Sequence, residues 1–228
     1  MCRRPRCAAG SERSGAGCCS ARIYFRGELA AAAAAAGDGG QWVNVNPAPA
    51  LFSDGAAAVV LCNSLALALA SRDRDTPGQG KGKGVYAVRD WWSGVTPDTS
   101  EEITYRPTES GFLVRLSRDI PHLICNAIRQ PFETLLRRNG IEGMEARDFS
   151  WAVHPGGLAV IRAVRDALQL DDEDLRATME VYTRKGNTSS VAVLAVLDEV
   201  RKEGGKEDVL ACSFGPGVTT EMMLMKRL

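Results

Sequence analysis

Apolar residues follow two different spacings along most of the chain. From residue 51 onward, several segments repeat apolar residues every three or four positions, which predicts helices with one buried face: 120–139, 157–168, 175–185 and 188–202. Short apolar runs between turn residues predict strands: 51–61, 85–91, 111–117, 151–153, 209–213 and 219–225. The polar stretches 71–84 and 93–110 are expected to be mostly loop. This mixture predicts a layered α/β domain, with helices packed on a sheet.

The first 50 residues differ from the rest of the chain in composition. Residues 2–20 are rich in Gly, Arg and Ser, and residues 30–36 are a run of alanines. Such segments have little apolar surface to bury. We therefore expect an irregular, low-complexity segment over residues 1–50 and a single α/β domain over residues 51–228.

Composition excludes several classes of function. The 28 basic and 28 acidic residues balance, so no basic field predicts nucleic-acid binding. Seven cysteines without a C-x-x-C pair, and only two histidines, make a zinc site or a disulfide framework a poor prediction. No apolar run approaches the roughly 20 residues that cross a bilayer. We expect a cytoplasmic protein that binds neither metal nor membrane.

Two polar side chains in glycine-flanked turns carry the candidate chemistry. His154 follows an apolar strand and precedes Pro-Gly-Gly, and Asn187 lies 33 residues later, beyond a predicted helix. A neutral imidazole N–H and a carboxamide N–H can together bind a developing oxyanion. Each residue also has a simpler interpretation, because a lone histidine is usually structural and Asn187 or Thr188 could cap the next helix.

The sequence resembles the C-terminal half of the type III polyketide synthases, the chalcone and stilbene synthase family. The resemblance covers roughly residues 51–228 and depends on short motifs in the right order: Leu51–Ala58 (LFSDGAAA), Asp119–Pro121 (DIP), the His154 and Asn187 turns, and Gly215–Glu221 (GPGVTTE). It implies a thiolase-like fold, of which this chain holds mainly the C-terminal half. It also implies a homodimer and a role of the kind known in plant flavonoid-type secondary metabolism.

The resemblance implies a decarboxylative Claisen condensation of malonyl-CoA onto a CoA-activated starter. CoA thioesters are then substrates, and no cofactor is expected. His154 and Asn187 would stabilise the enolate, and the histidine would also hold a cysteine as its thiolate. The family's cysteine lies in a Cys-x-x-Gly turn that opens a buried helix. Cys7 has that spacing, 45 residues before Phe52, but the polar residues 11–17 cannot form the helix that should follow.

The resemblance also assigns an acyl-binding pocket. Phe52 matches an aromatic gate of the family, whereas Val114 stands where a second aromatic gate is usual and Tyr105 where a glycine is usual. The Gly215-Pro216 turn shapes the acyl cavity in the family, although turn chemistry alone also explains it. The substrate-binding candidates are therefore Phe52, Tyr105, Val114, Ser189, Gly215 and Pro216.

Three hypotheses follow from these residues. The first is a type III polyketide synthase-like acyltransferase. The second is a truncated, non-catalytic remnant of that family that associates with full-length relatives. The third is a β-ketoacyl synthase-type condensing enzyme, which also uses Cys, His and Asn. The motifs His154-Pro-Gly-Gly and Phe214-Gly-Pro-Gly favour the polyketide family over the third.

Overall fold

The computed structural model describes residues 51–63, 65–66, 84–109 and 111–228. The expectations about residues 1–50, including the Cys7 turn, lie outside these ranges, as does nearly all of the predicted loop 71–84. The described residues fall into two compact units, one with residues 59–66 and the other with residues 51–58 and 84–228. The second unit contains the sheet, its helices and the candidate site.

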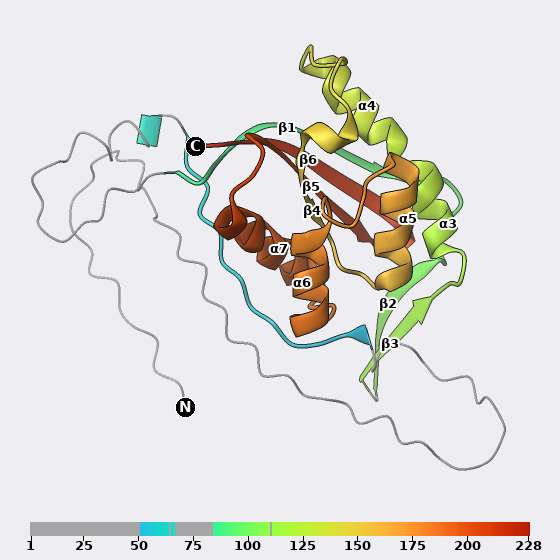
Figure 1. The fold of residues 1–228 in the computed structure, drawn as a ribbon. Coiled ribbons are helices and arrows are strands. Elements are labelled where there is room, and N and C mark those ends of the chain that lie inside the picture. Colours follow the sequence, from blue (N-terminus) through green and yellow to red (C-terminus); the bar gives the residue numbers. More distant parts are fainter. Residues whose placement is uncertain (1–50, 64, 67–83, 110) are drawn as a thin grey trace, which may run out of the picture. The chain divides into compact units, whose positions relative to one another are not determined.

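Four strands of the described chain form one mixed sheet (Figure 1). Their order is β1 (Tyr86–Val95), β6 (Thr219–Arg227), β5 (Asp208–Gly215) and β4 (Ser150–Val153). The β1–β6 and β6–β5 pairs are antiparallel, and β4 runs parallel to β5. The short strand β4 therefore lies at one edge of this sheet, with β5 on one side.

Helices cover both faces of the sheet, which confirms the layered α/β prediction (Figure 1). Helices α3 (Ile120–Ala127), α4 (Arg129–Arg138) and α5 (Leu158–Leu168) pack on one face, and α6 (Arg176–Lys185) and α7 (Ser190–Glu203) pack on the other. Alternation along the strands produces the two cores. In β4, Trp151 and Val153 belong to the first core and Ala152 to the second.

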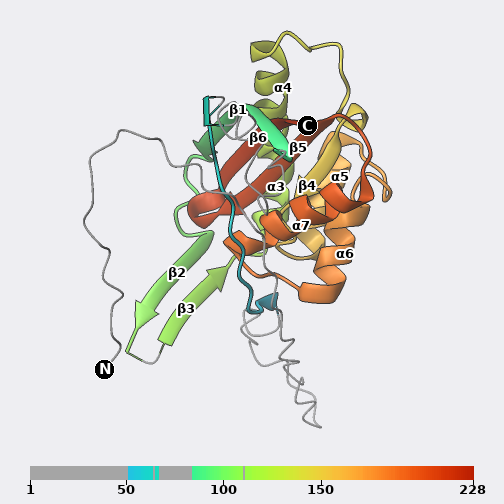
Figure 2. The same cartoon turned by 90° about the vertical axis from the view of Figure 1, so that its left-hand side faces the viewer.

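The prediction of loop over residues 93–110 is wrong in part. Strand β1 continues to Val95, and residues 103–108 form β2 (Ile103–Thr108), which pairs with β3 (Gly111–Leu116) as a separate antiparallel hairpin. Figure 2 shows this hairpin projecting away from the main sheet. Pro107 is tolerated because each strand of a two-stranded hairpin has a free edge.

The predicted helix 120–139 is two helices instead of one. Helix α3 ends at Ala127, and α4 begins at Arg129. Pro131, in the first turn of α4, explains the break. A proline ring clashes with the carbonyl group four residues earlier, here that of Ala127, and donates no hydrogen bond to it.

The prediction of a buried strand over residues 51–61 is wrong. Only Phe52 makes a bridge, with Asn187, and residues 53–61 have no regular structure. Val59 and Leu61 are 49% and 81% exposed, and Cys62 is exposed too. A β-branched run becomes a strand only when a neighbour supplies its backbone partners. Beyond Ser53, the described residues offer this segment no such neighbour.

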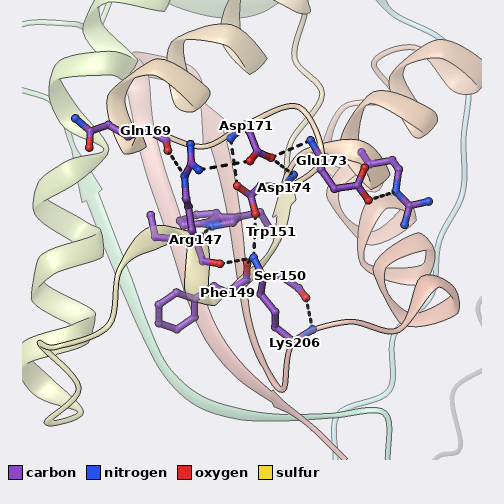
Figure 3. Close-up of polar contacts among 11 residues, drawn as sticks. Arg147, Phe149, Ser150, Trp151, Gln169, Asp171, Glu173, Asp174 and Lys206 are labelled. Atoms are coloured by element: carbon purple, nitrogen blue, oxygen red, sulfur yellow. Dashed lines mark hydrogen bonds and ion pairs between the residues drawn. The ribbon is translucent and has the colours of Figure 1, made fainter.

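Lys206 ties the start of β4 to the turn before α6 (Figure 3). Its ammonium group donates to the carbonyl oxygens of Arg147 and Phe149, the latter at 3.2 Å, and to the Asp174 carboxylate at 2.9 Å. These partners use all three ammonium protons. The backbone N–H of Lys206 also donates to Ser150 Oγ at 3.1 Å. The two elements are thus fixed together at the end of β4 farthest from His154.

Candidate active site

His154 is the first residue after β4 and begins the turn that connects β4 to α5. Its backbone N–H donates to the carbonyl oxygen of Cys212 at 2.8 Å, which extends the β4–β5 ladder by one bond. The N–H of Gly156 then donates to the His154 carbonyl at 2.8 Å, and the chain enters α5 at Gly157. The imidazole is therefore carried by a turn that the sheet holds on one side and a helix on the other.

The imidazole of His154 is buried and uncharged at neutral pH. Only 7% of the residue is exposed, and burial lowers its pKa from 6.5 to about 4. Burial acts in this direction because it disfavours the charged form. A neutral imidazole carries one N–H donor and one lone pair, so His154 can donate a hydrogen bond without carrying a positive charge.

Asn187 lies between α6 and α7, and its side-chain amide is held in one orientation. Its Oδ1 accepts the backbone N–H of Ser189 at 2.8 Å, and its Nδ2 donates to the carbonyl oxygen of Gly156 at 3.3 Å. The N–H side of the amide therefore faces the His154 turn. Asn187 is not the N-cap of α7: the N-cap is Ser189, which makes no side-chain cap bond, and Asn187 Oδ1 accepts the N–H of that N-cap residue instead.

A three-residue segment far away in sequence closes this part of the site. The N–H of Asn187 donates to the Leu51 carbonyl at 3.2 Å, and the N–H of Ser53 donates to the Asn187 carbonyl at 3.0 Å. The Ser53 hydroxyl also bonds the carbonyl of Lys185. Phe52, the predicted gate, is thereby paired with Asn187 in a parallel bridge. A backbone clamp of residues 51–53 fixes the Asn187 turn.

Gly156 brings the two predicted donors together. A Cβ placed on Gly156 would lie 3.1 Å from Cδ2 and 3.3 Å from Nε2 of His154. The carbonyl oxygen of the same residue accepts the Asn187 amide. The imidazole and the carboxamide, 33 positions apart in sequence, thus contact one glycine, and both are almost fully buried.

The Gly215-Pro216 turn is also anchored, although to a different part of the chain. The short 3₁₀ turn Pro216–Val218 joins β5 to β6, and Gly217 adopts φ +61°. The hydroxyl of Thr99 donates to the Gly217 carbonyl at 2.6 Å. The turn therefore both closes a hairpin and holds the loop that leads into β2.

The remaining pocket candidates divide between two places. Ser189 is next to Asn187 and has φ +58°, a value that non-glycine residues rarely adopt. Tyr105 and Val114 lie directly opposite each other in the β2–β3 hairpin. Tyr105 is 54% exposed, whereas Val114 is half-buried.

The described residues supply hydrogen-bond donors but no activated thiol. Cys212 is near His154 through its backbone, yet its thiol is buried, and burial raises the pKa of that thiol. It therefore stays protonated and unreactive. Cys62 is exposed and Cys125 half-buried. Cys7, the predicted nucleophile, lies outside the described ranges. Within those ranges, no group of three His, Cys, Asp or Glu side chains could hold a metal.

One buried polar residue beside the site was not predicted from the sequence. Thr178 on α6 is fully buried, and its hydroxyl lies 3.2 Å from the N and 3.3 Å from the O of Val153. The available signal was a polar β-branched residue on the apolar side of a helix, next to Ala177 and three positions before Val181. Polar groups buried in this way are hydrogen-bonded, which is the reason to look for such a partner.

The family is shown by the match of residues 91–228 to the family model described as chalcone and stilbene synthases, C-terminal domain. The chain belongs to the chalcone and stilbene synthase family. This chalcone and stilbene synthase relative is 37% identical over 198 residues to the type III polyketide synthase pspB of Penicillium soppii, covering 81% of this chain and 47% of that protein. It is 35% identical to type III polyketide synthase A of Arabidopsis thaliana, covering 78% of this chain and 44% of that protein.

Solved structures of type III polyketide synthases share the fold of this family member. The fungal enzyme ORAS matches with a TM-score of 0.68 and 30% identity over 78% of this chain and 48% of that chain. A type III pentaketide synthase from Neurospora crassa matches with a TM-score of 0.61 and 30% identity, over 66% and 44% of the two chains. The thiolase-like α/β fold is thereby confirmed. The chain spans about half the length of the curated relatives it matches.

The described chain contains no helix that is both long and apolar enough to cross a membrane.

Proposed function

We propose that this chain carries the decarboxylation half of a type III polyketide synthase active site, with His154 and Asn187 as the donor pair. The observation that carries this proposal is their common contact with Gly156, in which the N–H side of the Asn187 amide faces the His154 turn. The substrate is a malonyl thioester, in the first place malonyl-CoA.

The chemistry assigns each donor one task. The bond between the malonyl carboxylate carbon and the α-carbon breaks, and CO₂ leaves. The electron pair of this bond passes into an enolate whose charge rests on the thioester oxygen. His154, through the nitrogen next to Gly156, and Asn187, through Nδ2, donate hydrogen bonds to that oxygen. A buried donor of this kind contributes roughly 10²- to 10³-fold to the rate, because it is already oriented when the charge develops.

Condensation needs a second component, the acyl group of the starter on a cysteine. The enolate α-carbon attacks the acyl carbon, a C–C bond forms, and the cysteine thiolate leaves. Cys7 is the candidate nucleophile in this chain. We assign the acyl pocket to Phe52 and Ser189 beside Asn187, to Tyr105 and Val114 on the hairpin, and to the Gly215-Pro216 turn.

Other properties of the family enter the proposal at a coarser level. CoA thioesters as the only small molecules required, the absence of a cofactor, and assembly as a homodimer follow from the resemblance. The matching relatives come from both fungi and plants, so a role in plant flavonoid-type metabolism stays a prediction. Membership of the chalcone and stilbene synthase family favours malonyl-CoA chemistry over that of a β-ketoacyl synthase.

The test is CO₂ release from malonyl-CoA by the purified chain and by His154→Ala and Asn187→Ala variants. The chain offers a matched control, because His122 and Asn126 form an exposed His–Asn pair at 3.1 Å on α3. We expect each site variant to lose roughly 100-fold in rate and the His122→Ala and Asn126→Ala variants to keep the parent rate.

Two outcomes separate the hypotheses. Loss of starter loading in Cys7→Ala, with CO₂ release retained, would assign the nucleophile. A folded parent chain that releases no CO₂ would overturn the enzymatic proposal in favour of a non-catalytic family member. That alternative is then tested directly, by measuring whether the chain associates with a full-length type III polyketide synthase.

A further inference from the structure

Strand β4 has an open edge, and one side chain closes it. The N–H of His154 bonds to Cys212 in β5, so alternation along the strand turns the N–H and carbonyl groups of Val153 away from β5. Both groups are buried and face the side of β4 that has no strand neighbour among the described residues. Buried backbone groups of this kind need partners.

The Thr178 hydroxyl supplies both partners at once. It accepts the Val153 N–H at 3.2 Å and donates to the Val153 carbonyl oxygen at 3.3 Å. A hydroxyl group can do both because it has one proton and two lone pairs. Thr178 thus replaces, at a single residue, the ladder that a neighbouring strand would otherwise provide.

Strand β4 and helix α6 are joined at three successive positions. Lys206 links the start of β4 to Asp174, just before α6. Thr178 joins the last residue of β4 to the first turn of α6, and Asn187, just after α6, bonds to Gly156, just after β4. The middle link is the one nearest to His154 in sequence, one residue away.

We propose that Thr178 is a positioning residue for the reaction: its hydroxyl fixes Val153 from the open side of β4 and so sets where the imidazole of His154 lies relative to Asn187. The inference rests on the proposed function. It assigns Thr178 no contact with substrate, since its hydroxyl is occupied by the backbone of Val153. Its effect therefore falls on the rate at saturating malonyl-CoA rather than on KM.

The variant that tests this is Thr178→Val, which keeps the shape and removes the hydroxyl. We expect roughly a 10- to 100-fold lower rate of CO₂ release, because small misplacements of a catalytic group have effects of this size. Thr178→Ser, which keeps the hydroxyl, should restore most of the rate. Thr183→Val is the matched control, since Thr183 lies exposed on the same helix and its hydroxyl donates to the Met179 carbonyl of that helix.

A second readout does not depend on turnover. The chain has two histidines, so the imidazole ¹⁵N resonances of His154 and His122 can be followed separately by NMR. Thr178→Val should move the His154 resonances and leave those of His122 in place. Unchanged His154 resonances in a folded Thr178→Val protein would overturn the inference, whether or not the parent chain releases CO₂.

If Thr178→Val does not fold, hydrogen exchange in the parent chain decides the matter. The Val153 amide should exchange as slowly as paired amides within β5. Exchange of Val153 at the rate of an unpaired amide would show that the Thr178 link is not made, and the inference would fail.

Discussion

Gly156 meets both donors of the site, because its carbonyl oxygen accepts a hydrogen bond from the Asn187 amide and a Cβ built on it would touch the His154 imidazole. No side chain can be added there without displacing the ring, because a Cβ would come within 3.1 Å of Cδ2 of His154. Packing against the His154 ring therefore favours glycine at this position.

Gly156→Ala should impair the site while leaving the fold intact. The added methyl group would push the imidazole by a few tenths of an ångström, and we expect roughly a tenfold lower rate of CO₂ release. Gly143→Ala is the control, since a Cβ there meets nothing within 4 Å. Equal rates for the two variants would show that the contact with His154 does not matter.

The stability of the protein should fall as the pH drops through the range in which unfolded histidine titrates. His154 has its pKa lowered by burial from 6.5 to about 4, so the unfolded state takes up the proton first. The contribution of the uncharged His154 to the free energy of unfolding is fully present above pH 6.5. It is lost progressively between pH 6.5 and 4, and the total loss is at most roughly 3 kcal/mol. Urea unfolding at pH 7, 5.5 and 4 measures this loss.

Two glutamine variants assign the pH dependence to one residue. His154→Gln should flatten the dependence of the unfolding free energy on pH over this range. His122→Gln, which changes an exposed histidine, should leave it as in the parent. A parent-like slope in His154→Gln would mean that other groups cause the loss.

Lys206→Met should destabilise the protein by about 2 kcal/mol, because it leaves the Asp174 carboxylate and the Phe149 carbonyl without their ammonium partner. The Asp174 side chain is only 10% exposed, so water replaces this partner poorly. Lys226→Met is the control. Lys226 is similarly exposed but pairs with Glu207, which is 68% exposed, and its loss should cost about 0.5 kcal/mol or less. Urea unfolding compares the two.

Gly186→Ala should lower the free energy of unfolding more than Gly140→Ala does. Gly186 ends α6 with φ +65° and ψ −153°, a region that is essentially restricted to glycine. A Cβ there would also lie 3.3 Å from Ser53 Oγ, in the clamp around Asn187. We expect a loss of about 2 kcal/mol, against about 1 kcal/mol for Gly140→Ala, which has φ +66° and open space around it.

Much of the domain could be predicted from local patterns, and the errors have identifiable causes. Helix α5 and strands β4 to β6 follow the predicted spacings closely, because each has an apolar pattern that matches its burial. The break at Ile128 was missed because apolar spacing outweighed the effect of Pro131. The run 51–61 was misassigned because strand formation depends on a neighbour that no local pattern reveals.

The site residues also separate into those that local sequence patterns reveal and those that depend on distant contacts. His154 and Asn187 could be singled out because glycine-flanked turns after regular elements are visible in sequence. The roles of Thr178 and Lys206 could not, because their partners, Val153 and Asp174, lie 25 and 32 positions away, although Thr178 is recognisable as a polar residue on the apolar side of a helix. Their importance comes entirely from tertiary contact.

The clamp of residues 51–53 has a consequence for how the site opens. It is attached to the Asn187 turn largely through backbone bonds, and Ser53 lies 132 positions from its partner Lys185. Contacts between such distant segments carry a large loop-closure entropy and contribute little to the early stages of folding. We therefore expect this clamp to form last and to release first. Release of the clamp would expose the Asn187 turn to solvent in a local opening that leaves the two hydrophobic cores intact.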